Sequence, residues 1–168
     1  MKDHFRKTHE RILRKFLFHG VEFVLIGGHA SIYHGVERTT SDLDILVRPT
    51  LKNGAKIIDS CQDLGLEVTG LTPNDFLTPN VFSFGMSPSS VDILNYSIGV
   101  SIDAIFENAI YAKMDDLRMK VIDIRDLLTN KMAINRSSDK GLLDQHDILV
   151  LKRIINLKKK GKWNPSDF

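Results

Sequence analysis

Cysteine is almost missing from this sequence, and long apolar runs are missing altogether. The single cysteine, Cys61, has no partner for an internal disulfide, and no Cys/His spacing indicates a structural zinc site. The longest apolar runs, such as 23–26, are far shorter than the roughly 20 residues of a membrane span. The charged stretch over 1–15 contains no apolar signal-peptide core. We therefore expect a soluble, cytoplasmic protein with no membrane partner.

An excess of charge of one sign is missing as well. The chain has 23 Lys and Arg against 21 Asp and Glu, and this net charge of +2 is too small to indicate nucleic-acid binding by itself. Hydrophobic residues make up 42% and charged residues 26%, which is ordinary globular composition and excludes extensive disorder. The 168 residues fit one domain. We expect a sheet-containing core over about 1–122 and C-terminal helices over about 123–168.

The spacing of apolar residues and of glycine and proline predicts the order of the elements. Helices are expected over 3–19, 29–34, 51–64, 102–112, 125–135 and 142–159. Strands are expected over 22–26, 43–47, 66–69, 81–84, 90–94 and 120–122, the pair at 81–84 and 90–94 forming a hairpin. This order predicts an α+β fold with a mixed β-sheet flanked by helices and a helical C-terminal third.

A glycine pair, Gly27-Gly28, stands between the strand at 22–26 and the helix at 29–34. Glycine allows the backbone to approach a ligand closely, and the start of a helix offers unpaired N–H groups and the positive end of a dipole. Together these features make a plausible phosphate site. A glycine pair by itself is more often an ordinary strand-to-helix turn.

Asp42 and Asp44 lie two residues apart at the start of the strand over 43–47. The period of a strand puts both carboxylates on one face, where they repel each other unless a cation lies between them. Mg²⁺ takes oxygen ligands of this kind together with substrate phosphates. An isolated D-x-D is more often a solvated pair at a strand end.

The order of these two motifs gives them weight, because a glycine turn followed by a D-x-D strand brings backbone amides near a metal site. A two-metal arrangement needs one more acid. Asp92, in the apolar strand over 90–94, is the candidate, since its apolar neighbours imply burial and a buried carboxylate needs a partner. An Asp facing water at a sheet edge is the alternative.

The sequence LIGGHASIYHGVERTTSDLDILV, followed by VDIL, resembles the nucleotidyltransferase superfamily with the DNA-polymerase-β-like fold. The family pattern is a glycine pair, a short helix, D-x-D and a third acid on a later strand. The form found here looks closest to the bacterial AbiEii-type toxin and minimal nucleotidyltransferase branch. Members of that branch often carry a later Lys, then Arg and Asp, and Lys131, Arg136 and Asp139 match. Asp144 and Asp147 stand at a looser spacing than the family pattern, so neither is assigned as catalytic.

The resemblance implies a role for each matching residue. Asp42 and Asp44 would bind Mg²⁺ or Mn²⁺, and Asp92 would share a metal ion and help to deprotonate the attacking hydroxyl. The residues implied at the nucleotide phosphates are Gly27, Gly28, Ser41, Arg38 and, as a counter-charge for the triphosphate, Lys131. Arg38 and Thr40 would also fix the loop before the acids.

The implied reaction is transfer of a nucleoside monophosphate from a nucleoside triphosphate (NTP) to a hydroxyl or phosphate, with release of pyrophosphate. The acceptor stays open between tRNA or other RNA, a protein side chain and a small molecule. A toxin–antitoxin role, with a partner toxin or antitoxin protein, is one reading of the resemblance. A catalytically inactive domain that binds a nucleotide or a partner is the alternative, and the presence of all three acids argues against it.

Overall fold

The computed structural model describes residues 4–86, 88–134 and 136–164, and its centre is a mixed β-sheet. The sheet has six strands in the order β3-β4-β2-β1-β6-β5. The strands are β1 (Phe23–Ile26), β2 (Leu43–Val47), β3 (Val81–Phe84), β4 (Val91–Leu94), β5 (Ile110–Met114) and β6 (Leu117–Val121). The predicted α+β class is therefore confirmed.

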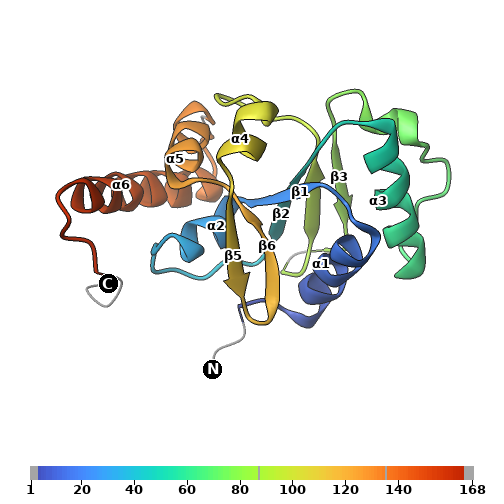
Figure 1. Cartoon of the computed structure of the whole chain (residues 1–168), viewed down its shortest axis with the longest axis horizontal. Helices are drawn as coiled ribbons and strands as arrows, with labels where there is room; N and C mark the ends of the chain where they lie inside the picture. Colours follow the sequence, from blue (N-terminus) through green and yellow to red (C-terminus); the bar gives the residue numbers. More distant parts are fainter. Residues whose placement is uncertain (1–3, 87, 135, 165–168) are drawn as a thin grey trace.

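Helices flank this sheet, as Figure 1 shows. They are α1 (Lys7–His19), α2 (Gly27–Tyr33), α3 (Leu51–Asp63), α4 (Ile102–Asn108), α5 (Ile124–Ala133) and α6 (Asp139–Lys159), with a 3₁₀ turn, η1 (Pro73–Phe76). Helix α1 packs beside α3, and α5 packs beside α6, so that the C-terminal part is helical as expected. Within the described ranges, no helix combines the length and the apolar character that crossing a membrane requires.

Strand β2 lies between β1 and β4 and fixes the level of the residues on both. It runs antiparallel to β1, with Ile26 opposite Asp44, and parallel to β4, with Asp44 opposite Asp92. The apolar residues of β2, Leu43, Ile45, Leu46 and Val47, are all fully buried. The register therefore places the end of β1, the start of β2 and Asp92 of β4 at one level of the sheet.

The opposite ends of β1 and β2 are held by one buried side chain, Asn53 of α3. Its amide oxygen accepts a hydrogen bond from the Glu22 amide at 2.7 Å, and its amide nitrogen donates to the carbonyl oxygens of Glu22 and Arg48, each at 3.0 Å. Asn53 is 1% exposed. Because Glu22 precedes β1 and Arg48 follows β2, the side chain ties both strands to α3.

Two predicted elements are wrong. Residues 66–69 form no strand, because their backbone joins turns such as that from the Leu66 amide to the Cys61 carbonyl oxygen. The helix expected over 102–112 stops at Asn108, and the residues after it enter β5. An apolar run of this length is compatible with a helix or a strand. Residues Ile110–Met114 form a strand because they pair with β6.

Several predicted boundaries also move. Helix α1 begins at Lys7 rather than at residue 3, which lies outside the described residues, and α6 begins at Asp139 rather than at 142. The strand predicted over 120–122 begins three residues earlier, at Leu117. Gly27 and Gly28 are the first residues of α2 and do not form a separate turn before it.

Replacing Asn53 by alanine tests how strongly the β1–β2 register depends on this one side chain. We expect Asn53→Ala to lower the free energy of unfolding by about 2 to 4 kcal/mol, because three backbone groups in part-buried hydrogen bonds lose their partner. Urea denaturation measures the change. Lys52→Ala, an exposed position in the same helix, is the control and should stay within about 0.5 kcal/mol of the wild type. A loss below about 1 kcal/mol in Asn53→Ala contradicts the assignment.

Candidate active site

A cavity of about 460 Å³ opens where β1 ends and β2 begins. Every residue assigned to the site from the sequence lines it: Gly27, Gly28, Arg38, Ser41, Asp42, Asp44, Asp92 and Lys131. Most of these residues lie close together because β1, β2 and β4 are neighbours in the sheet and α2 continues directly from β1. Further lining residues that the sequence did not assign include Arg6, Arg136, Lys140 and Asp144.

Steric space explains why positions 27 and 28 of this cavity are both glycine. Gly27 has φ +67°, and a Cβ atom there would overlap the carboxylate of Asp44. A Cβ atom on Gly28 would overlap the guanidinium of Arg38 and the hydroxyl of Thr40. The two glycines thus leave room for side chains of the site to lie directly over the start of α2. Both replacements would therefore crowd polar groups of the cavity.

Asp44 is the most strongly perturbed acid of the site. Burial raises its pKa to about 6, and the charge of Asp92 on the neighbouring strand contributes to the rise. Burial alone would also raise the pKa of Asp42, but the Ser90 hydroxyl and the Lys140 ammonium hold it below its ordinary value. The pKa values of the two acids of the D-x-D motif are therefore shifted in opposite directions. The positive charge near Asp44 is too small to offset the cost of burying its carboxylate.

The three carboxylates have chemistry that fits a divalent cation. All donors are oxygens, which Mg²⁺ and Mn²⁺ favour, and Oδ1 of Asp42 is buried without a hydrogen-bond partner among the described residues. However, in the described part of the chain no three His, Cys, Asp or Glu side chains are grouped as a ready metal site. One oxygen of Asp92 accepts a hydrogen bond of 2.6 Å from Ser83 Oγ, and Asp42 Oδ2 lies 3.5 Å from Lys140 Nζ. A cation at Asp42 Oδ2 would have to displace Lys140, whereas the bond from Ser83 occupies only one of the two oxygens of Asp92.

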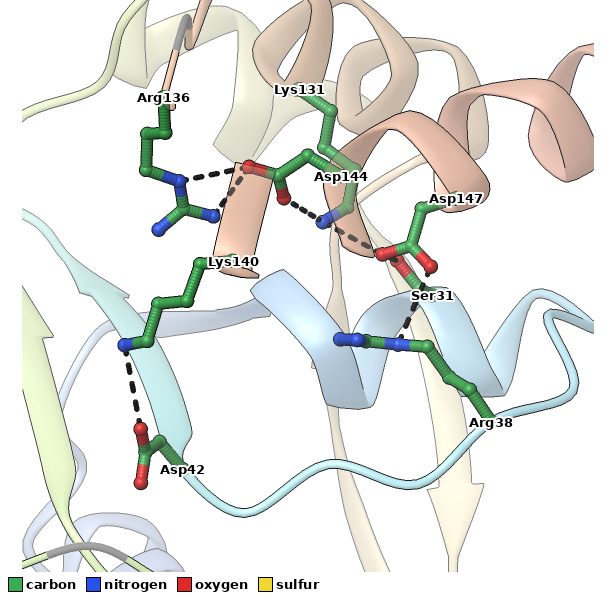
Figure 2. A network of polar contacts seen from close by, with 8 residues as sticks. All are labelled: Ser31, Arg38, Asp42, Lys131, Arg136, Lys140, Asp144 and Asp147. Atoms are coloured by element: carbon green, nitrogen blue, oxygen red, sulfur yellow. Dashed lines mark hydrogen bonds and ion pairs between the residues drawn. The ribbon is translucent and has the colours of Figure 1, made fainter. Parts of the chain in front are cut away.

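A buried ionic network borders the cavity on the side of α6 (Figure 2). Lys131 Nζ lies 3.1 Å from Asp144 Oδ1 and 2.9 Å from Asp147 Oδ2. Ser31 Oγ of α2 donates to Asp147 at 3.1 Å. All three charged residues are at most 5% exposed, so the two carboxylates need the cation that they surround. The network fixes α6 against α2 and α5.

Arginine side chains extend this network into the cavity. Arg136 Nε donates to Asp144 Oδ2 at 2.8 Å, and Arg38 Nε lies 3.3 Å from Asp147 Oδ1 as an ion pair. Arg38 Nη1 is buried and has no hydrogen-bond partner among the described residues. Arg38 therefore keeps a donor available beside Gly28.

Asp144 and Asp147 were not assigned from the sequence, although the sequence contains a signal for them. The buried residues of α6 are Gly141, Asp144, Asp147, Leu151 and Ile154. These recur at helical spacing, so both acids lie on the buried face of the helix. Acids on such a face need cationic partners, and Lys131 and Arg38 were available. Asp139, which the resemblance matched, does not line the cavity.

Comparison with known proteins gives matches in structure only. No protein-family model matches the chain, and no curated protein matches its sequence. The structure of the lincosamide antibiotic adenylyltransferase LnuA with lincomycin bound has 18% identity, a TM-score of 0.53, and coverage of 90% of this chain and 98% of that chain. The solution structure of the antibiotic-resistance factor ANT(2'')-Ia has 10% identity, a TM-score of 0.55, and coverage of 92% of both chains. At such identities the likeness shows the fold alone, and that fold is the nucleotidyltransferase fold.

Proposed function

We propose that the protein is an Mg²⁺- or Mn²⁺-dependent nucleotidyltransferase that moves a nucleoside monophosphate from an NTP to a hydroxyl or phosphate of an acceptor. One observation carries the proposal: Asp42, Asp44 and Asp92 line the same cavity as the glycine pair that begins α2. The nucleotidyltransferase fold supports it. The closer relation to AbiEii-type toxins stays a prediction from the sequence.

Gly27, Gly28, Ser41 and Arg38 would bind the phosphates of the nucleotide. The support for Arg38 is strongest, because its Nη1 is buried without a hydrogen-bond partner among the residues described, and its Nη2 lies against Gly28. A guanidinium is well suited to phosphate oxygens, since it offers several fixed donors. Ser41 lines the cavity between Arg38 and the D-x-D motif and can add a hydroxyl donor.

Asp42, Asp44 and Asp92 would hold the divalent cation. When bound, the cation neutralises charge on the phosphates and on the leaving pyrophosphate. Asp92 would also take the proton of the acceptor hydroxyl as that oxygen attacks the α-phosphorus. Ser83 already donates a hydrogen bond to one oxygen of Asp92, which fixes the other relative to the cavity. Most of the rate acceleration would then come from positioning of the reactants and neutralisation of charge, rather than from a covalent intermediate with the protein.

Lys131 would act from the wall of the cavity. Its ammonium is bound to both Asp144 and Asp147, so much of its charge is already balanced. We propose that it stabilises the phosphate side of the cavity chiefly by holding α5 against α6. Direct contact with the triphosphate would require it to leave at least one of these carboxylates.

The acceptor and the biological role are the least constrained parts of the proposal. A toxin–antitoxin role would make RNA, such as tRNA, or a partner protein the acceptor. The basic run Lys158-Lys159-Lys160-Gly161-Lys162 contains four cations and no acid, but such a run is by itself more often a solvated tail than an RNA contact. Small hydroxyl-bearing molecules are the third class, in line with the lincomycin bound to LnuA.

A catalytically inactive domain that binds nucleotides or a partner is the second candidate. The observation in its favour is that no three of the described His, Cys, Asp or Glu side chains form a ready metal site. The two candidates differ in one measurable product, since only the enzyme releases pyrophosphate.

Removing the acids of the D-x-D motif tests the enzyme. With labelled NTPs, Mg²⁺ and either total RNA or the protein itself as acceptor, Asp42→Asn and Asp44→Asn should lower transfer and pyrophosphate release at least about a hundredfold. Asp59→Asn, an exposed acid of α3, is the matched control and should keep wild-type activity. Nucleotide binding by the wild type without pyrophosphate release, with any acceptor class, would support the inactive domain instead.

Metal binding should appear as a pH-dependent rise in melting temperature. Without metal, the raised pKa of Asp44 means that its contribution to stability is present below about pH 4 and is lost as the pH rises through about 6. Millimolar Mn²⁺ should restore stability above that pH, by about 3 to 8 °C at about pH 7.5, and much less at about pH 5, where Asp44 holds a proton.

The control for this measurement is Asp44→Asn, which removes both the titrating group and a metal ligand. Its melting temperature should lose the part of the pH dependence that Asp44 causes, and its rise with Mn²⁺ should shrink at about pH 7.5. An equal rise in the wild type and in the variant would show that the metal binds elsewhere.

A further inference from the structure

Besides Arg6, four basic side chains line the cavity, and they differ in how far the acids that they pair with are buried. Arg38, Lys131 and Arg136 each form an ion pair with Asp144 or Asp147, both of which are buried. Lys140 is different, because its side chain is 59% exposed and it forms an ion pair with Asp42 of the D-x-D motif. Its charge is therefore paired with a proposed metal ligand.

The backbone of Lys140 lies in a helix that the buried network holds in place. Lys140 is the second residue of α6, and Asp144 and Asp147 anchor that helix one and two turns later through the buried network. Figure 2 shows its side chain extending from α6 toward Asp42 and away from Asp144 and Asp147. The backbone of Lys140 is thus fixed, while four rotatable bonds allow the ammonium to move within the cavity.

The contact between Lys140 and Asp42 is weak enough to be exchanged. Nζ and Oδ2 lie 3.5 Å apart, whereas Asp42 itself is only 14% exposed and its other oxygen has no hydrogen-bond partner among the described residues. An exposed ammonium held at this distance contributes little free energy. A divalent cation at the same carboxylate would attract it more strongly than the single charge of Lys140 does.

We propose that Lys140 balances Asp42 in the free protein, gives up this place to the divalent cation, and then binds the triphosphate of the nucleotide. The inference rests on the proposed function. Before metal binding, Lys140 competes with the cation for Asp42. Afterwards its ammonium remains in a cavity that receives several negative charges, and its three donors bind phosphate oxygens.

Lys140→Gln tests the proposal because its two roles predict changes of opposite sign. The affinity for Mn²⁺ alone, measured from the electron paramagnetic resonance signal of the free ion, should increase about threefold to tenfold because the competing charge is gone. The affinity for inorganic tripolyphosphate at saturating Mn²⁺, measured by calorimetry, should decrease about fivefold to twentyfold. Tripolyphosphate is the probe because it does not depend on the base preference.

The matched control is Lys152→Gln, which removes an exposed lysine farther along α6 and should leave both affinities unchanged. Weaker binding of Mn²⁺ by Lys140→Gln, or both affinities within about twofold of the wild type, overturns the inference. Wild-type protein that binds neither Mn²⁺ nor tripolyphosphate overturns the proposed function as well. Wild-type protein that binds both, beside an unchanged Lys140→Gln variant, overturns the role of Lys140 alone.

Discussion

The pairing of β2 with both of its neighbours is the constraint on which the site depends. Because β2 runs antiparallel to β1 and parallel to β4, Asp44 lies beside Ile26 on one side and Asp92 on the other. A shift of β2 by one residue would turn its acids to the opposite face of the sheet and expose its apolar residues. The buried Leu43 and Ile45 therefore protect the position of the acids as well as the core.

This arrangement concentrates like charge, and the rest of the molecule compensates for it in two separate ways. Asp144 and Asp147 are buried and pair with Lys131 between them, and this network gives rigidity. Asp42 is paired with Lys140, whereas burial and the charge of Asp92 raise the pKa of Asp44. Acids that are left electrostatically unfavourable in a cavity are typical of sites that bind a cation or perform chemistry.

The sequence predicted the parts of this site that depend on local patterns. Gly27, Gly28, Asp42 and Asp44 lie within one strand-helix-strand unit, so period and turn chemistry were enough to place them together. The partners of Asp144 and Asp147 depend on how α6 packs against α2 and α5, which no local pattern contains. Strand β5 was predicted as helix for a related reason, since only its pairing with β6 distinguishes the two structures. The contact from Lys140 to Asp42 joins distant segments and could not be read from spacing.

The buried network also bears on how the molecule reaches its folded form during synthesis. Arg38 is synthesised long before α6 and Lys131 shortly before it, whereas α6 supplies the two carboxylates with which they pair. Until α6 is made, those cations have no such partners, and Ser31 of α2 lacks its acceptor. A nascent chain can thus form its central strands early, while the wall of the cavity that contains Lys131 and Asp144 is completed only when α6 docks.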